Sequence, residues 1–318
     1  MNITAKSLKA TAANALVLLF VVCAFAQDGP APRPKHATLP RSFADLSADE
    51  VLGRVFDAYD ARTGRVATML NGEKQPALVR IREARAWYAL GRENLVVLVD
   101  LAGTDYDLED LCGNCAMYAL LAVLKRDGRA LTLVARQDVP ASAVAGEEST
   151  SGGASDEAFA PFFISGHDPT VKLDLAPYCF NERETLLGIR REHMWLPAQD
   201  YATDLTLYRV EGARLRQVFA EPVVEREYPQ GASKGMPVIK TTSLISPRAG
   251  GGEFYDLVIE KTTARCIDND DDADCTRPRE PARVVKKSLE VWSFDGKSFQ
   301  RTNKPAPPAP SGKAACGG

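Results

Sequence analysis

The chain has 318 residues, of which 45% are hydrophobic and 25% charged, and its formal net charge is −3. This length and apolar content suffice for one large domain, or two smaller ones, with a substantial core. The slight acidic excess gives no reason to expect nucleic acid or an anionic membrane as a partner.

The first 26 residues have the pattern of an export signal. Lys6 and Lys9 precede an apolar run over residues 12–22, and Ala24-Phe25-Ala26 supplies the small residues that signal peptidase accepts. The run is too short to span a hydrocarbon core as a helix, and no later stretch is apolar enough to cross a membrane. We therefore expect cleavage after Ala26, a periplasmic or secreted location, and a change in formal charge from −3 to −5, because two lysines and no acid are removed.

Two alternatives to simple cleavage exist. The leader could remain as a signal anchor, or a lipid could be attached at Cys23, because Phe20-Val21-Val22-Cys23 is similar to a bacterial lipobox. Val22 stands where a lipobox has a small residue, which argues against the lipid anchor.

A spacer and a helix are predicted next. Residues 27–42 are rich in proline and polar groups and are expected to form a flexible spacer. Ser47 and Glu50 make a capping-box pattern, so a helix is predicted to begin after Ser47 and to pack on a sheet. Its apolar face would consist of Val51, Leu52, Val55, Phe56 and Tyr59.

From residue 77 the pattern is typical of short strands. Strands are predicted over residues 78–81, 86–90 and 95–101, with a turn at residues 91–94 between the last two.

An acid-glycine turn then recurs at a fixed spacing. Gly128, Gly212 and Gly296 lie 84 residues apart, and each follows an acidic residue, which predicts three hairpins with glycine at positive φ. Apolar residues recur around each glycine, and a large one, which we expect on the opposite face, stands four positions before it. The first set is Leu121, Val123 and Leu131 with Leu124; the second is Leu205, Leu207 and Leu215 with Tyr208; the third is Leu289, Val291 and Phe299 with Trp292.

These columns predict an internal repeat. An Asp-Leu strand opens each unit, at Asp100, Asp174 and Asp256, and the units span about residues 95–136, 170–220 and 255–302. Polar loops over residues 141–157 and 228–237 separate them. We expect a mainly β domain over residues 43–303, with antiparallel sheet units in three related repeats, propeller-like or sandwich-like, and one N-terminal helix. The proline-rich tail, residues 304–318, is expected to be disordered.

Six cysteines remain after cleavage, and in an oxidising compartment their default state is the disulfide. Spacing alone leaves the connectivity open. We favour Cys112 with Cys115 and Cys266 with Cys275, each of which closes a short loop. Cys179 and Cys316 are then left over, and Cys316 either has no role or pairs with another chain.

The sequence Cys112-Gly113-Asn114-Cys115 also resembles the thioredoxin redox motif. There a helix follows the cysteines, and its dipole makes the first thiol nucleophilic. Residues 116–125 have high helix propensity, but the repeat columns place them in a strand. A structural disulfide is therefore favoured over a redox site, a metal site or free thiols.

The acidic loop over residues 268–274 is a candidate calcium site. Its alternating carboxylates could converge on Ca²⁺; they are Asp268, Asp270, Asp272 and Asp274. The loop is not an EF-hand, because Ala273 and Arg279 stand where glycine and glutamate are needed. A solvated loop between Cys266 and Cys275 is the alternative.

Histidines and arginines supply the remaining polar candidates. His167 and His193 are expected at the surface or in turns, since no nucleophile-elbow, zinc-helix or phosphate-loop pattern accompanies them. A polar binding surface could be lined by Arg183, Arg190, Arg191 and Trp195.

Through its Asp-Leu strands and closing hairpins, the chain resembles secreted bacterial proteins of uncharacterised function that carry repeated antiparallel β units. It is more remotely similar to propeller repeats of the integrin-like kind. This resemblance covers residues 95–302 and implies calcium in Asp-rich loops, although three units are fewer than the four to eight blades of a propeller.

These observations favour an exported, non-enzymatic β-repeat protein that binds an envelope or extracellular partner. The alternatives are a periplasmic thiol-disulfide oxidoreductase that uses Cys112 and Cys115, and a calcium-binding module.

Overall fold

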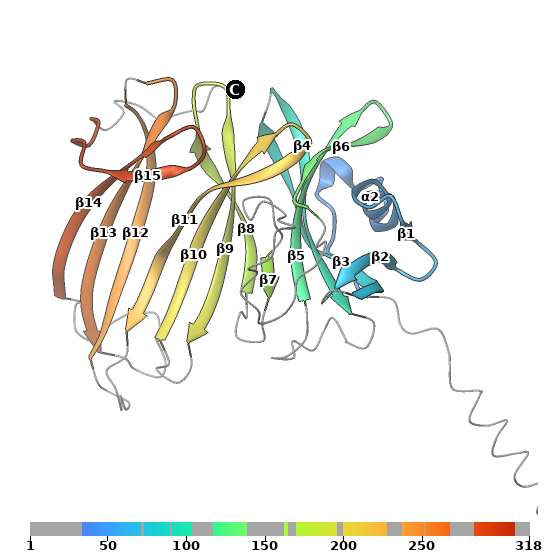
Figure 1. The fold of residues 1–318 in the computed structure, drawn as a ribbon, viewed down its shortest axis with the longest axis horizontal. Coiled ribbons are helices and arrows are strands. Elements are labelled where there is room, and N and C mark those ends of the chain that lie inside the picture. The colour runs from blue at the N-terminus through green and yellow to red at the C-terminus, as the bar shows by residue number, and fades with distance from the viewer. Residues whose placement is uncertain are drawn as a thin grey trace, which may run out of the picture. The chain divides into compact units, whose positions relative to one another are not determined.

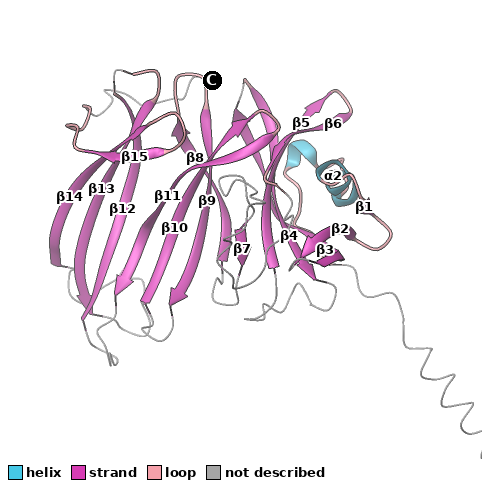
Figure 2. Cartoon of the chain, viewed as in Figure 1, coloured by secondary structure: helices cyan, strands magenta, loops and turns pink. Residues whose placement is uncertain are grey.

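Two antiparallel runs of strands and one short helix make up the fold in a computed structural model of the chain (Figures 1 and 2). The chain divides into two units, Met1–Pro34 and Lys35–Gly318, and the fold described here is that of the second. The structure describes residues 34–70, 73–89, 91–103, 117–138, 162–164, 170–195, 200–227, 237–250, 252–267 and 283–308.

In the N-terminal run, the first six strands lie side by side in chain order, each paired antiparallel with its neighbour. These strands are β1 (Tyr59–Asp60), β2 (Arg65–Leu70), β3 (Glu73–Ala89), β4 (Arg92–Gly103), β5 (Met117–Asp127) and β6 (Ala130–Arg136), and β7 (Phe162–Ile164) pairs with β5. The two strands predicted over residues 78–81 and 86–90 are parts of the single strand β3. A register shift between Ile81 and Glu83 lets β3 continue along β4 without a break.

The predicted helix is α2 (Ala48–Val55), which follows a 3-10 turn, η1 (Arg41–Phe43). Its capping box is confirmed: the Ser47 side chain accepts from the Glu50 backbone N–H, and Glu50 accepts from the Ser47 backbone N–H. The helix ends at Val55, four residues before the end of the predicted apolar face, because Phe56 is its C-cap and Tyr59 belongs to β1. Its buried side chains, those of Val51, Leu52 and Val55, pack with apolar residues of β3, β4 and β5.

The C-terminal run contains eight strands, again paired in chain order and antiparallel. They are β8 (Thr170–Cys179), β9 (Thr185–Trp195), β10 (Asp200–Glu211), β11 (Arg214–Glu227), β12 (Pro237–Ala249), β13 (Tyr255–Ile267), β14 (Arg283–Phe294) and β15 (Phe299–Thr302). A short parallel contact, Arg136 of β6 with Arg214 of β11, joins this run to the first. Apolar side chains of both runs, such as Val96, Leu121, Leu187 and Tyr208, form one buried cluster.

The three predicted hairpins are confirmed. Gly128, Gly212 and Gly296 have φ values of 63°, 61° and 98° and lie in the turns of β5–β6, β10–β11 and β14–β15. The side-chain columns are less regular, because Leu289 is 51% exposed while its counterparts Leu121 and Leu205 are fully buried. The described strands form one continuous sheet that is not closed, so separate propeller blades are not seen.

The three Asp-Leu aspartates are each bound to a neighbouring strand. Asp100 is fully buried and accepts from Arg80 and Arg82 of β3. Asp174 accepts from Arg190 at 2.6 Å, and Asp256 accepts from the Ser293 hydroxyl at 2.6 Å. These carboxylates therefore hold strands together.

Among the residues that the structure describes, no helix is long and apolar enough to cross a membrane.

Candidate functional site

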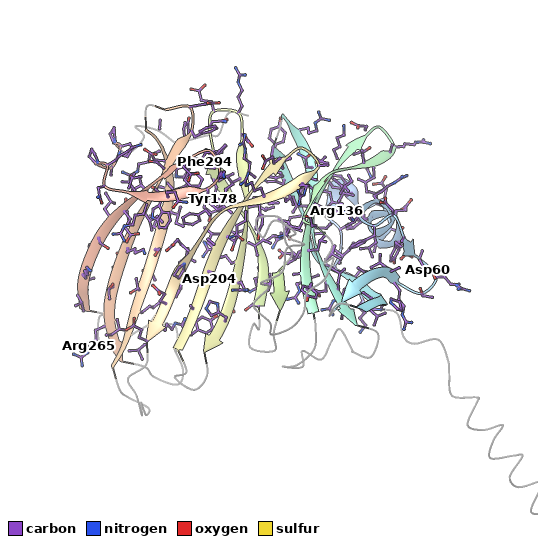
Figure 3. The ribbon with its side chains drawn as sticks, viewed as in Figure 1. Asp60, Arg136, Tyr178, Asp204, Arg265 and Phe294 are labelled. Atoms are coloured by element: carbon purple, nitrogen blue, oxygen red, sulfur yellow. The ribbon has the colours of Figure 1, made fainter. Side chains whose placement is uncertain are left out.

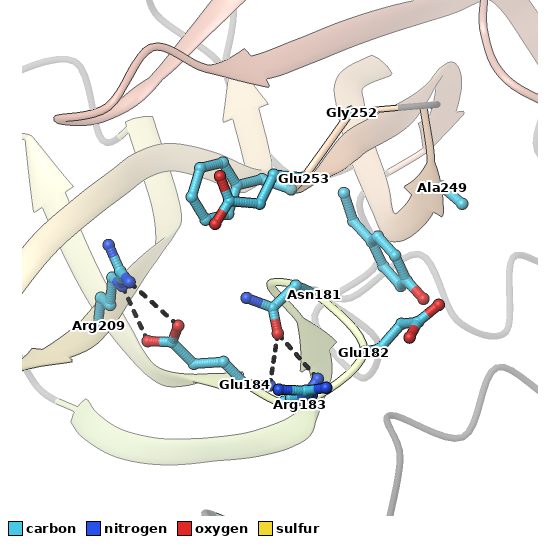
Figure 4. A pocket seen from close by; sticks show the side chains of 10 residues that line it. Asn181, Glu182, Arg183, Glu184, Arg209, Ala249, Gly252 and Glu253 are labelled. Carbon is cyan, nitrogen blue, oxygen red and sulfur yellow. Dashed lines mark hydrogen bonds and ion pairs between the residues drawn. The ribbon is translucent and has the colours of Figure 1, made fainter.

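A cleft of about 760 Å³ opens at one end of the C-terminal run, and we call it the rim cleft. It lies between the hairpin after β8 and the loop between β12 and β13. Its lining consists of Asn181, Glu182, Arg183, Glu184, Arg209, Ala249, Gly252, Glu253, Phe254 and Tyr255 (Figure 4). The backbone N–H of Tyr255 donates to the Phe180 carbonyl oxygen at 2.8 Å, which holds the two loops together.

Aromatic side chains support the cleft from the core. Phe180 is fully buried. The centroid of its ring lies 4.5 Å from the ring centroid of Phe254 and 4.8 Å from that of Phe294. The edge-on contacts with Phe294 and Phe299 are the geometry that aromatic pairs prefer. The cleft therefore lies against a well-packed aromatic cluster.

Arg209 of β10 connects this aromatic cluster to the charged lining. Its guanidinium lies 4.6 Å above the Phe180 ring and 5.8 Å from the Phe254 ring. The same group donates two hydrogen bonds to Glu184, at 2.8 and 3.2 Å. This two-pronged pair holds Arg209 in place and neutralises Glu184.

The Asn181 side chain fixes the turn of the hairpin. Its Oδ1 accepts from the backbone N–H groups of Arg183 and Glu184, at 2.8 Å each, as Figure 4 shows. An asparagine that bonds to the backbone two and three residues ahead is a common way to stabilise a tight turn. The turn therefore presents the neighbouring side chains of Glu182 and Arg183 in a defined direction.

Three charged side chains of the lining have no hydrogen-bonding or ion-pair partner among the described residues. Glu182, Arg183 and Glu253 are exposed, and none of them makes a side-chain hydrogen bond or ion pair with a described residue. Since Arg209 and Glu184 cancel each other, the free charges are two carboxylates and one guanidinium. The rim cleft therefore has an excess of one negative charge beside the rings of Phe254 and Tyr255.

The predicted polar surface is brought together only in part. Arg183 lines the rim cleft, but Arg190 is bound to Asp174, and Arg191 lies 3.6 Å from Asp204. Neighbouring residues of a strand point to opposite faces, so Arg190 and Arg191 cannot share one surface. Trp195 ends β9, and its side chain lies outside the described residues.

The expectation that His193 lies at the surface is wrong. It is 7% exposed, and its Nδ1 lies 3.5 Å from Asp204 Oδ2 of the adjacent strand β10. The position in mid-strand, paired with Ala202, explains the burial. His167 lies outside the described residues.

Asp174 also binds a buried tyrosine. The Tyr178 hydroxyl donates to Asp174 at 2.9 Å. Burial, and then the Asp174 carboxylate, raises the pKa of Tyr178 well above its usual range, so this phenol stays protonated and structural.

The cysteine predictions have different outcomes. Cys112, Cys115, Cys275 and Cys316 lie outside the described residues, and for Cys266 only the backbone is described, in β13. Cys179 is 1% exposed and disulfide-bonded, so the interpretation that it is left over is wrong.

The helix that a thioredoxin-like arrangement requires after Cys115 is not formed. Residues 117–127 are strand β5, which pairs with β4 over residues 94–102 and with β6. The apolar residues on both faces of this strand are buried, so tertiary packing overrides the helix propensity of the segment. The oxidoreductase interpretation loses its main structural requirement.

The candidate calcium ligands Asp268, Asp270, Asp272 and Asp274 also lie outside the described residues. Within the described part of the chain, no group of three or more histidine, cysteine, aspartate or glutamate residues could hold a metal ion.

Sequence reasoning missed most of the rim cleft. Of its lining, only Arg183 was a candidate; Glu182, Glu184, Arg209 and Glu253 were not. The one local signal was the Asn181 turn, because the two loops are about 70 residues apart and no periodicity connects them.

No protein-family model, curated protein or solved structure matches the chain.

Proposed function

We propose that the protein is an exported, non-enzymatic β-repeat module that binds an envelope or extracellular protein by taking a cationic side chain of that partner into the rim cleft. The observation that carries the proposal is the pair of carboxylates of Glu182 and Glu253, which line this cleft and have no ion-pair partner among the described residues. A lysine or arginine of the partner would balance the negative excess and could lie against the aromatic rings.

The expected affinity is modest. Exposed ion pairs contribute about 0.2–1 kcal/mol each, and salt screens them. Binding through the rim cleft should therefore be weak and should depend on salt concentration. Such an affinity suits a partner that is retained in the same compartment as the protein.

The wider proposal includes export and repetition. The leader over residues 1–26 supports a periplasmic or secreted location, and the three glycine hairpins, which are similar in turn and spacing, support descent from three related units. The first two units lie next to each other through β6 and β11.

The test uses two small probes on the mature protein. Acetyl-Lys-Lys-Lys-amide and acetyl-Glu-Glu-Glu-amide are titrated in low salt, and amide chemical shifts are followed by NMR. We expect the lysine probe to shift residues around Asn181 and Phe254 and the glutamate probe to shift none of them. The double variant Glu182→Gln, Glu253→Gln should weaken lysine-probe binding about tenfold, if each lost ion pair is worth roughly 0.7 kcal/mol.

The matched control is Glu227→Gln, an exposed carboxylate at the far end of β11. It should bind the lysine probe as the unmodified protein does. Equal binding of both probes, or equal weakening in the control and in the double variant, would contradict the proposal.

A further inference from the structure

The last long strand of the sheet, β14, has one edge that its neighbours use only in part. On one side β13 pairs with β14 over residues 283–292, whereas on the other side β15 pairs with it only over residues 291–294. No other described strand pairs with β14, and Figure 1 shows it as the outermost long strand of the C-terminal run. We call the outer edge of residues 283–290 the free edge. Such an edge presents backbone N–H and C=O groups that an added strand can bind.

Apolar side chains are exposed along the free edge. Val284, Val285 and Leu289 are 50%, 65% and 51% exposed, and they are three of the six large apolar side chains that are exposed in the described part of the chain. Val285 is not opposite any residue of β13, because the register shifts between Thr263 and Ala264. A strand added at this edge would remove apolar area from water, which favours its binding.

Three cations at or beside the free edge have no counter-ion in the described part of the chain. Lys286 and Lys287 belong to the free edge itself, and Arg265 lies opposite its first residue on β13. All three side chains are exposed, and none of them makes a hydrogen bond or ion pair with a described residue.

The carboxylates near the free edge, in contrast, are already balanced by cations. Lys261 Nζ and Arg301 Nη1 each lie 3.4 Å from a carboxylate oxygen of Glu290. Glu260 lies 2.8 Å from Arg248. The free edge therefore carries an excess of positive charge, although the whole chain has a net charge of −3.

A second copy of the chain fits the free edge poorly. A two-fold antiparallel pairing that used all of residues 283–290 would place Lys286 of one copy directly opposite Lys287 of the other, because the centre of the segment lies between them. Like charges directly opposite each other across a strand pair are destabilising. The charges therefore favour an acidic partner over self-association.

We propose that the free edge of β14 binds an extended, acidic segment of a partner protein as an additional strand. Successive residues of a strand point to opposite faces, so Lys286 and Lys287 would pair with two adjacent acidic residues of the partner, one on each face. Apolar residues on either side of the acidic pair would lie against Val284 and Leu289. In this mode of recognition, backbone hydrogen bonds supply affinity and the side chains supply specificity.

The free edge is separate from the rim cleft. Tyr255, which lines the cleft, is the first residue of β13, whereas the free edge lies alongside residues 259–265 of that strand. Figure 3 shows Arg265 at the lower end of the strands and Phe294, where β14 ends, near the upper end. The two surfaces have excess charge of opposite sign, so they select different ligands. This inference goes beyond the proposed function, and either can fail alone.

A peptide that reads the same in both directions tests the proposal without an assumption about strand direction. Acetyl-Val-Thr-Glu-Glu-Thr-Val-amide is titrated into the mature protein in low salt, and amide hydrogen exchange is followed by NMR. At about 90% saturation, exchange at the outward-facing amides of the free edge should slow about tenfold, because only a tenth of the protein is unbound. The counterpart with lysines in place of the glutamates should give no protection. Equal protection by the two peptides would overturn the proposal.

Substitution of the two lysines tests the role of charge. The double variant Lys286→Gln, Lys287→Gln should bind the acidic peptide about tenfold more weakly, because two exposed ion pairs are lost. The matched control is Lys172→Gln, Lys297→Gln, which removes two exposed lysines from β8 and from the β14–β15 turn. It should bind as the unmodified protein does, and equal weakening in both double variants would refute recognition by the free edge.

Protein concentration separates an acidic partner from a second copy. Exchange at the same amides is measured without peptide at two protein concentrations that differ about tenfold, since self-association depends on concentration. Unchanged exchange supports the acidic partner. Protection at the higher concentration would show that a second copy occupies the free edge, and the proposed occupant would be wrong. A failure of the lysine tripeptide to bind the rim cleft would count against the proposed function and leave the result at the free edge unaffected.

Discussion

The backbone N–H of Tyr255 donates a hydrogen bond of 2.8 Å to the carbonyl oxygen of Phe180, so the start of β13 meets the hairpin that follows β8. The two residues are five strand positions apart in the C-terminal run, and they come together because the run curves around an aromatic core. That core holds Phe180, Phe219, Phe254, Phe294 and Phe299. This junction brings together the two loops that line the rim cleft.

Truncation of Phe180 should therefore destabilise the protein strongly. Phe180→Ala removes a fully buried ring that contacts three other rings and the guanidinium of Arg209. We expect a loss of about 3–5 kcal/mol in the free energy of unfolding, measured by urea denaturation. Tyr88→Ala, at a side chain that is 61% exposed, should change it by less than about 0.5 kcal/mol; similar losses in both variants would show that the cluster is not the core of this end.

The Asp100 carboxylate should be another strong determinant of stability. Asp100 is fully buried between Arg80, at 2.8 Å, and Arg82, at 2.6 Å. Asp100→Ala leaves two partly buried guanidinium groups without their counter-ion and should cost about 3–5 kcal/mol in urea denaturation.

The control for Asp100 is an exposed carboxylate of the same run. Asp127 is 50% exposed and is paired with Lys125 and Arg92, so Asp127→Ala should cost no more than about 1 kcal/mol. A cost for Asp100→Ala as small as this would mean that the arginines find other partners.

Gly188 is predicted to be intolerant of any side chain. A Cβ there would lie 2.7 Å from the Asp174 carbonyl oxygen and 3.2 Å from the Tyr178 ring. The contact at 2.7 Å is with backbone, in a stretch where the β8–β9 register shifts between Asp174 and Tyr178, so Gly188→Ala should lower stability by about 1–3 kcal/mol.

The opposite sign is expected at Gly53 in α2. A Cβ at Gly53 meets nothing within 4 Å, and alanine favours the helix over glycine by about 0.5–1 kcal/mol. Differential scanning calorimetry should therefore give a lower Tm for Gly188→Ala and a higher Tm for Gly53→Ala. A rise in Tm for both would refute the close approach of β8 and β9.

Glu221 of β11 should make stability fall as pH rises. Burial raises its pKa above 4.5, Lys261 of β13 lowers it, and Glu290 of β14, Glu225 of β11 and Asp204 of β10 raise it. A carboxyl whose folded pKa is raised stabilises the fold below the unfolded pKa, and this stability is lost as pH rises through the folded pKa.

The measurement is the Tm of Glu221→Gln at pH 4 and pH 7. The variant should be more stable than the unmodified protein at pH 7, and this advantage should shrink at pH 4, where the carboxyl is largely protonated in both states. Glu227→Gln, at an exposed position of the same strand, is the matched control for the change from a carboxylate to an amide. A lower Tm of Glu221→Gln at pH 7 would mean that its pairing with Lys261 outweighs burial.

Local features of the fold could be predicted from the sequence. The turns at Gly128, Gly212 and Gly296 and the cap at Ser47 depend on residues within three positions of one another, so short patterns were sufficient. Predictions that depended on longer segments were less accurate: β3 was predicted as two strands because its register shift near Ile81 interrupts the alternation.

The sequence by itself determined an acidic, mainly β chain with glycine hairpins and one capped helix, because turn conformation and capping are properties of neighbouring residues. Only the tertiary structure decided that His193 is buried, that residues 117–127 are a strand and that Glu182 and Glu253 share a cleft. These outcomes depend on burial of apolar faces and on contacts between segments far apart along the chain, which no local pattern encodes.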